Sequence, residues 1–177
     1  MKKARIIYNP TSGRELFKKH LPEVLQKFEQ AGYETSCHAT TCEGDAIQAA
    51  KVAGERGFDM IVAAGGDGTI NEVVNGIAEL EERPHIAVIP VGTTNDFARA
   101  IGIPLNNVIQ AVEVILNGEP QKIDIGRVNE HYFINIAGGG RLTELTYEVP
   151  SKLKTMVGQL AYYLKGMEML RLSVQLK

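Results

Sequence analysis

The sequence AAGGDGTINE at residues 63–72 joins a short apolar run, Met60–Val62, to a segment with apolar residues at helical spacing. This order predicts a buried strand, a tight turn and a helix. The three glycines of the turn permit positive φ angles and let the backbone approach a ligand without a Cβ in between. The start of the helix offers unpaired N–H groups and a partial positive charge. The turn is therefore a candidate cradle for phosphate.

Asp67 is the unusual member of this turn. A carboxylate repels phosphate, so its presence is explained by a metal ion between the two groups. The turn is not a Walker A loop, because no Gly-Lys-Ser/Thr follows the glycines. It also departs from the dinucleotide fingerprint, because Asn71 stands where Gly or Ala is required. The alternative is a tight turn in which Asp67 bonds its own backbone as an Asx-turn.

Two other predicted strands end in similar polar clusters. The run at residues 5–8 is followed by NPTSG at 9–13, and the run at 85–89 by PVGTTND at 90–96. In an open parallel sheet such strand ends lie side by side at the carboxyl edge, where ligands bind. Their hydroxyls and amides suit phosphate and sugar oxygens, although each alone is more often a helix cap or turn residue.

The whole chain alternates between strand and helix patterns up to residue 120. Strands are predicted at 4–8, 33–39, 59–63 and 85–89, and helices at 14–31, 43–56, 70–82, 95–101 and 107–117. This alternation predicts an α/β fold with a mostly parallel sheet between two helical layers.

The pattern changes after Pro120. Residues 121–128 and 131–137 alternate around Asn129-Glu130, which predicts a hairpin, and residues 151–170 have the spacing of an amphipathic helix. We therefore expect a nucleotide-binding domain at 1–120. Residues 121–177 are expected to form an incomplete β-rich second domain.

Composition excludes several classes of protein. The 177 residues are 44% hydrophobic and 23% charged, as in an ordinary globular protein. A net charge of −2 gives no field that favours nucleic acid. No apolar stretch approaches membrane-spanning length. Cys37 and Cys42 have neither zinc nor redox spacing, so we expect free thiols in a reducing cytoplasm.

Three motifs in order carry a family resemblance. NPTSG at 9–13, GGDGTINE at 65–72 and PVGTTNDFAR at 90–99 resemble the diacylglycerol kinase family of bacterial lipid kinases, over about residues 4–170. NAD kinases and 6-phosphofructokinases share the glycine–aspartate turn more distantly. The resemblance implies their three-layer fold with a β-sandwich-like second domain. It also implies ATP as phosphate donor, Mg²⁺, and diacylglycerol at a membrane surface as the acceptor that becomes phosphatidic acid.

The resemblance also assigns roles to residues. ATP is expected to contact Asn9, Pro10, Thr11, Ser12, Gly13, Thr40, Gly66, Asp67, Gly68, Thr69, Ile70, Asn71, Glu72 and Thr93. Asp67 is expected to bind Mg²⁺, directly or through water, and to act in catalysis together with Asp96, while Asp124 is a further candidate metal ligand. On the sequence alone, Thr40 is equally explained as a helix cap before Glu43, Asp96 as a cap and Asp124 as a strand-edge charge.

The general base of the family is an acidic residue in a late DGE-type segment, which these residues do not contain. We expect the base beyond Lys177, and a 177-residue chain that binds nucleotide but transfers phosphate weakly or not at all. The resemblance also implies a homodimer as a candidate assembly, and a cytoplasmic protein associated peripherally with the inner face of the membrane.

Two alternatives stay open. One is an NAD kinase or a sphingoid kinase, although the PVGTTNDFAR turn favours the lipid branch over NAD kinases. The other is a non-catalytic nucleotide-binding module.

Overall fold

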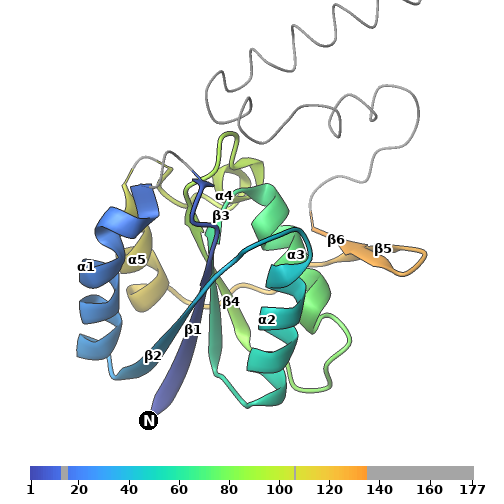
Figure 1. The fold of residues 1–177 in the computed structure, drawn as a ribbon, viewed down its shortest axis with the longest axis horizontal. Coiled ribbons are helices and arrows are strands. Elements are labelled where there is room, and N and C mark those ends of the chain that lie inside the picture. The colour runs from blue at the N-terminus through green and yellow to red at the C-terminus, as the bar shows by residue number, and fades with distance from the viewer. Residues whose placement is uncertain (13–15, 106, 135–177) are drawn as a thin grey trace, which may run out of the picture. The chain divides into compact units, whose positions relative to one another are not determined.

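Four parallel strands form the centre of the computed structural model, which describes residues 1–12, 16–105 and 107–134, with the side chain of Leu16 left out (Figure 1). The strands are β1 (Lys2–Tyr8), β2 (Tyr33–Ala39), β3 (Met60–Gly65) and β4 (His85–Pro90). Their spatial order is β2-β1-β3-β4, and every neighbouring pair is parallel. The predicted parallel α/β sheet is confirmed.

The central strand β3 is apolar throughout because both of its faces are covered. Its residues from Ile61 to Ala64 are fully buried. A strand of a parallel sheet with helices on both faces requires such a continuous apolar run. The edge strand β2 is only half-buried and accordingly carries polar residues such as Glu34 and Ser36.

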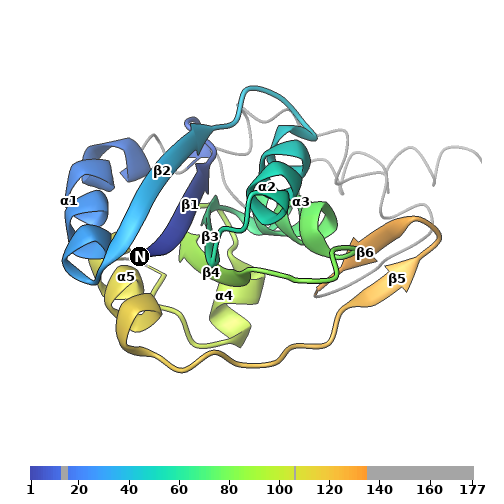
Figure 2. The same cartoon turned by 90° about the horizontal axis from the view of Figure 1, so that it is seen from below.

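Helices cover both faces of the sheet, as Figure 2 shows from below. On one face α1 (Leu16–Gln30) and α5 (Val108–Asn117) bury Phe17, Phe28 and Val112 against the sheet. On the other face α2 (Asp45–Glu55) and α3 (Asp67–Ile77) bury Ala50, Ile70 and Val73. The short helix α4 (Asp96–Ala100) adds Phe97 and Ala98 to this second core. The predicted three-layer arrangement is therefore confirmed.

The strand order creates a switch point between β1 and β3. The chain leaves β1 toward β2 on one side, and leaves β3 toward β4 on the other. In open α/β sheets, ligands bind where the direction of the connections reverses, outside the carboxyl ends of the strands. Asn9 N bonds Ala64 O at 3.2 Å, so the strand ladder continues into the loops that border this point.

Helix α3 begins earlier and ends earlier than the predicted 70–82. It starts at Asp67, and Gly66 alone separates it from β3. Asp67, Gly68 and Thr69 therefore belong to the first helical turn rather than to a loop. The helix ends at Ile77, before the acidic segment at 79–82.

Helices α2 and α3 pack at close range. The face of α2 toward the core consists of alanines. A Cβ placed on Gly76 of α3 would collide with the carbonyl oxygen of Ile47 and lie 2.8 Å from Ala50 Cβ. Gly76 is therefore required for the spacing of these two helices rather than for backbone flexibility.

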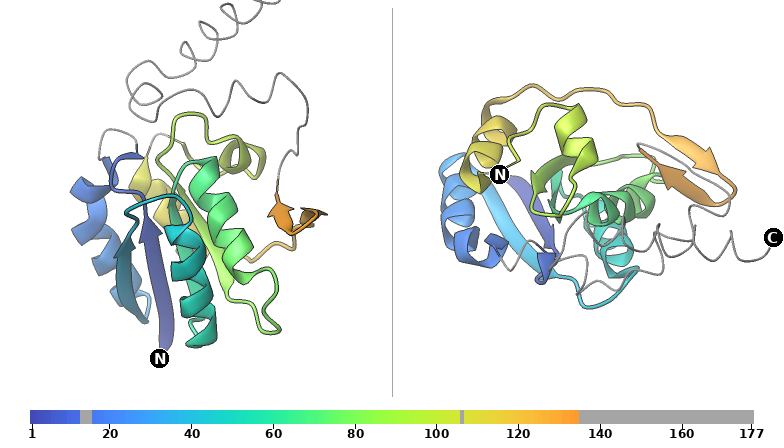
Figure 3. Two further views of the ribbon diagram at one scale, coloured as in Figure 1. Left: turned by 45° about the vertical axis from the view of Figure 1, so that its right-hand side comes forward. Right: turned by 90° about the horizontal axis from the view of Figure 1, so that it is seen from above.

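A short antiparallel hairpin, β5 (Gly126–Val128) and β6 (His131–Phe133), lies beside α3 and is orange in Figure 3. Asn75 of α3 anchors it: Asn75 Nδ2 donates to Tyr132 O at 2.8 Å, and Tyr132 N donates to Asn75 Oδ1 at 2.9 Å. Asn129 forms the turn at φ 53°. The hairpin is confirmed, but its first strand is shorter than predicted, because residues 121–125 are irregular; residues 135–137 of the second predicted strand lie outside the described residues.

The described residues belong to one compact unit, Met1–Asn135. The division at residue 120 stays a prediction, and the helix predicted over 151–170 lies outside the described residues. No helix in the described ranges is both long and apolar enough to cross a membrane.

The packing at Gly76 gives a test of the α2–α3 interface. We expect Gly76→Ala to lower the free energy of unfolding by about 1–3 kcal/mol, because the added methyl group must displace backbone of α2. This loss should exceed the gain of about 1 kcal/mol that alanine brings to a helix. Urea unfolding measures it.

Gly68→Ala is the matched control, because a Cβ there meets no described atom within 4 Å. Its stability should equal or exceed that of the wild type. A Gly76→Ala protein as stable as the Gly68→Ala protein would show that the interface does not require the glycine.

Candidate functional site

The site residues predicted from the sequence come mainly from four connections at the carboxyl edge of the sheet, which is uppermost in Figure 1. These connections follow β1, β2, β3 and β4 in turn. Because the strands are parallel, their ends meet at one edge. The structure thus brings the three polar clusters together as expected, with Thr40 from β2 as the fourth contributor.

The turn after β1 is held by Asn9. Its Oδ1 accepts hydrogen bonds from the backbone N–H of Thr11 at 2.9 Å and from the Thr11 hydroxyl at 2.8 Å. Ser12 N closes the turn on Asn9 O at 3.2 Å. Asn9 therefore builds the loop, and Thr11 is its exposed part. Gly13 lies outside the described residues.

Two of the three glycines at the junction of β3 and α3 lie in close packing, and the positive φ expected from the sequence is wrong for all three. None of Gly65, Gly66 and Gly68 has a positive φ. A Cβ on Gly65 would meet the side chain of Thr69, and one on Gly66 would lie 3.2 Å from Gly92 Cα. Gly68 differs from both, because it is exposed and faces open space.

The amino terminus of α3 is available to an anion. Its N-cap residue is Gly66, and no side chain caps this helix start within the described part of the chain. The first N–H groups of a helix point outward along its axis and carry a partial positive charge. With Gly68 exposed, a phosphate can reach these groups directly.

Asp67 caps a second helix. Its carboxylate accepts hydrogen bonds from the Thr94 hydroxyl at 3.0 Å, from Asp96 N at 3.1 Å and from Phe97 N at 2.9 Å. The last two are the first amides of α4. Asp67 therefore bonds a neighbouring turn rather than its own backbone, unlike the Asx-turn alternative.

The turn after β4 is closed by Asn95, which is buried and left-handed, with φ 52° and ψ 47°. Thr93 and Asp96 are exposed. Asp96 Oδ1 accepts a hydrogen bond from Arg99 at 3.0 Å in an exposed ion pair. The sequence predicted the Asn95 amide as a donor to phosphate and sugar oxygens, but the amide is buried and bonds Gly92 N and Gly92 O instead.

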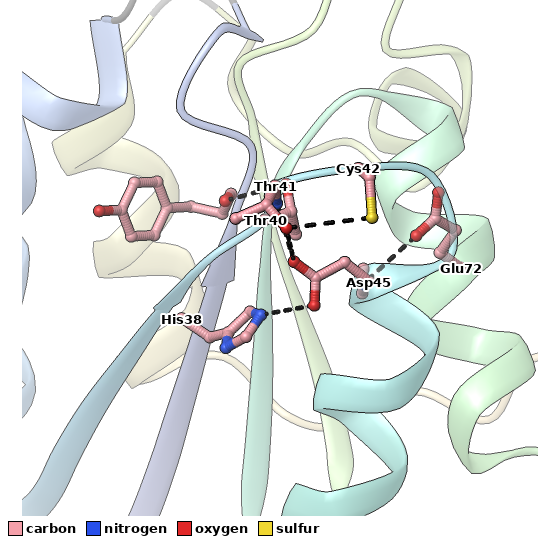
Figure 4. Close-up of polar contacts among 8 residues, drawn as sticks. His38, Thr40, Thr41, Cys42, Asp45 and Glu72 are labelled. Carbon is pink, nitrogen blue, oxygen red and sulfur yellow. Dashed lines mark hydrogen bonds and ion pairs between the residues drawn. The ribbon is translucent and has the colours of Figure 1, made fainter.

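Thr40 directly follows β2 and bonds the last residue of β1. Its N–H donates to Tyr8 O at 2.9 Å, and its hydroxyl lies 3.4 Å from the same oxygen. Thr40 therefore extends the sheet ladder rather than capping a helix. The start of α2 is instead bonded by Glu72, whose Oε2 accepts from Ala46 N at 3.1 Å (Figure 4).

Asp45 organises the loop that follows β2, as Figure 4 shows. It accepts hydrogen bonds from Thr41 N at 2.8 Å, from the Thr41 hydroxyl at 2.9 Å and from His38 Nε2 at 2.9 Å. The Thr41 backbone bond is the largest cause that lowers the pKa of Asp45, followed by the bond to His38. These three residues were missed, although Thr and Asp around a glycine before a helix form a capping signal.

The structure places three other predicted residues in different surroundings. The side chain of Ile70 is fully buried in the core. Asn71 accepts the Asn75 side-chain amide through its backbone oxygen, inside α3. Asp124 is exposed in the irregular segment before β5.

The carboxylates at this edge suit a magnesium ion that also binds the phosphates of a substrate. Within the described ranges, no group of three or more His, Cys, Asp or Glu side chains could hold a metal ion. Mg²⁺ often keeps its waters and takes one or two carboxylates plus substrate phosphates. Asp67, beside the open start of α3, fits a cation that is shared with a bound nucleotide.

A surface hollow of about 500 Å³ lies elsewhere, along α5. Pro104, Glu113 and Val114 are among its lining residues. No predicted site residue lines it. The candidate site is therefore the open carboxyl edge of the sheet and not this hollow.

Comparisons with known proteins show the family to which the chain belongs. A family model described as the diacylglycerol kinase catalytic domain matches residues 3–128. A diacylglycerol kinase of Bacillus subtilis (strain 168) is 75% identical over 170 residues, which are 96% of this chain and 56% of that protein. One of Staphylococcus carnosus (strain TM300) is 60% identical over 169 residues, 96% of this chain and 55% of that protein.

A solved structure has the same fold. It is a diacylglycerol kinase from Bacillus anthracis strain Sterne, 32% identical, with a TM-score of 0.68 over 76% of this chain and 48% of that one. The chain spans about half the length of the curated relatives it matches.

The lowered pKa of Asp45 gives a pH test. Its hydrogen bonds stabilise the fold at neutral pH, and this contribution is lost as pH falls through the lowered pKa of the folded protein. We expect Asp45→Asn to be less stable than the wild type at pH 7, with the difference shrinking below about pH 4. Urea unfolding between pH 7 and pH 3 measures it.

Glu82→Gln is the control, because it removes one carboxylate from an exposed position after α3. It should leave stability nearly unchanged throughout. A difference between Asp45→Asn and wild type that is equally large at pH 7 and pH 3 would show that the charge of Asp45 is not what stabilises the loop.

Proposed function

Because the chain belongs to the diacylglycerol kinase catalytic domain family, we propose that it binds Mg²⁺–ATP at the carboxyl edge of its sheet for phosphoryl transfer to diacylglycerol. The γ-phosphate passes to the free hydroxyl of the lipid, the bond to the β-phosphate oxygen breaks, and ADP, phosphatidic acid and a proton result. Phosphoryl transfer depends mainly on positioning and charge stabilisation.

The uncapped amino terminus of α3 at the switch point is the observation that carries this proposal. It offers backbone N–H donors and the positive end of the helix dipole at the switch point, where open α/β sheets bind their ligands. The turns at Asn9–Ser12 and Gly92–Asp96 come from the strands on either side of β3, so they border the phosphates. The exposed Gly68 leaves room for a phosphate oxygen at the first turn.

Thr40, which directly follows β2, lies at the same edge and is a further proposed contact of the nucleotide. Mg²⁺, when bound, neutralises charge on the phosphates. Asp67 is the residue that would hold it, with Asp96 as an exposed neighbour and Asp124 as a second carboxylate from outside the sheet edge.

The acceptor is proposed from the relatives, which are named for diacylglycerol. A lipid acceptor calls for peripheral association with a membrane surface. The base that takes the hydroxyl proton is expected outside these 177 residues. We also propose that the protein forms a homodimer.

The Gly68→Ala variant tests the binding of Mg²⁺–ATP without a change in the stability of the fold. We expect wild-type stability but an affinity for Mg²⁺–ATP that is lower by about tenfold, which corresponds to about 1.4 kcal/mol. The methyl group occupies the space where a phosphate approaches the amides of α3. Isothermal titration calorimetry measures the affinity.

Gly57→Asn is the matched control, because Gly57 has φ 66°, which asparagine tolerates, and lies at the opposite edge of the sheet. Its affinity should equal that of the wild type. If a folded Gly68→Ala protein binds Mg²⁺–ATP with unchanged affinity, then the phosphate does not bind at the start of α3.

The acceptor is tested by transfer of labelled γ-phosphate to diacylglycerol micelles, a sphingoid base and NAD, offered together. The enzymes are this chain and a chimera in which it replaces the matching 170 residues of the Bacillus subtilis relative. We expect labelled phosphatidic acid from the chimera, and weak or no transfer by the chain alone.

Label in NADP or in a sphingoid phosphate would contradict the lipid assignment. A chimera that binds ATP and labels none of the three acceptors would favour a non-catalytic nucleotide-binding module.

A further inference from the structure

Asn95 is the one polar residue that is buried within the described ranges, at 6% exposed. It also adopts the left-handed conformation, at φ 52° and ψ 47°. Residues other than glycine take this conformation at a cost, which asparagine bears best. A buried amide in a disfavoured backbone conformation at the edge of a candidate site calls for a physical explanation.

The side chain of Asn95 pairs with a whole backbone unit. Its Oδ1 accepts from Gly92 N at 2.9 Å, and its Nδ2 donates to Gly92 O at 3.0 Å. Both polar atoms are therefore satisfied, and the turn from Gly92 to Asn95 is closed from inside. A carboxylate or an aliphatic group of similar size cannot make both bonds.

This closed turn lies against the start of α3. A Cβ on Gly92 would collide with Gly66 Cα and lie 2.8 Å from Asn95 Oδ1. Gly92 is therefore needed for the backbones of the two turns to touch, and a Cβ on Gly66 would make a tight contact of 3.2 Å with Gly92 Cα. Gly66 is the N-cap residue of α3, so the Gly92 turn and the proposed phosphate cradle form one packed unit.

The residues on either side of Asn95 supply all three of these hydrogen-bond donors to the Asp67 carboxylate. Thr94 precedes Asn95, and Asp96 and Phe97 follow it. The left-handed conformation at Asn95 turns the chain between Thr94 and Asp96. The three donors converge on one carboxylate because the chain turns there.

We propose that Asn95 is a positioning residue: by clamping Gly92 it fixes the direction of the Asp67 carboxylate beside the start of α3. This inference rests on the proposed function, in which Asp67 holds the cation shared with ATP. Asn95 itself is buried and touches no substrate. It acts through Gly92, Thr94 and the first amides of α4.

Asn95→Gly is the decisive variant, because glycine keeps the left-handed conformation and removes only the clamp. We expect a folded protein in which the Asp96 and Phe97 amides exchange with solvent about tenfold faster, as their bonds to Asp67 open locally. Its affinity for Mg²⁺–ATP should fall about tenfold to a hundredfold, as when a partner that orients a metal ligand is lost. Its affinity for ATP in EDTA should change much less.

Asn129→Gly is the matched control. Asn129 is also left-handed, at φ 53°, but lies in the β5–β6 turn. This variant should keep wild-type exchange at Phe97 and wild-type affinity for Mg²⁺–ATP. A general loss of stability, by contrast, would weaken binding with and without Mg²⁺ alike.

Thr94 provides a second pair of variants if Asn95→Gly does not fold. Thr94→Val removes one donor to Asp67 and leaves the clamp, and we expect weaker Mg²⁺–ATP binding that Thr94→Ser restores. Wild-type Mg²⁺–ATP affinity in folded Asn95→Gly, or in Thr94→Val, would overturn the inference. A wild-type chain that binds no Mg²⁺–ATP would instead overturn the proposed function.

Discussion

Burial of β3 on both faces is the constraint on which the rest of this structure depends. A strand from Met60 to Gly65 with no exposed face requires helices on both sides and parallel neighbours. Parallel neighbours place all strand ends at one edge, and the β2-β1-β3-β4 order places a switch point beside β3. The fold thus places the candidate site before any of its side chains is considered.

Two glycines and one carboxylate then join separate turns at this edge. Gly66 and Gly92 allow backbone contact between the turns after β3 and β4. Asp67 belongs to α3 yet caps α4, so the two helix starts are joined through one side chain. A carboxylate that is held by three hydrogen bonds has one orientation, which is what a shared cation needs.

The sequence predicts the alternation of elements and the gathering of polar turns, because both follow from hydrophobic period and strand order. It does not predict why the glycines are present. Gly65 packs against Thr69 within the same strand–helix turn, and Gly66 lies against Gly92 from the next turn, a contact between turns that no local pattern reveals. The bonds of Asp67 to the start of α4 are tertiary, because they join residues 29 and 30 positions apart, and the start of α3 at Asp67 follows from a strand that runs through Gly65. The boundaries and the support of the site therefore required the structure.

Amide chemical shifts of the isotope-labelled 177-residue chain, titrated with Mg²⁺–ATP, test the location of the site most directly. We predict saturable shifts that are largest at residues 9–12 and 66–69, with Gly32 and Gly57 at the opposite edge unchanged. Saturable shifts confined to the hollow along α5 or to the opposite edge, or no saturable shift at all, would contradict the assignment of the phosphate site to the start of α3.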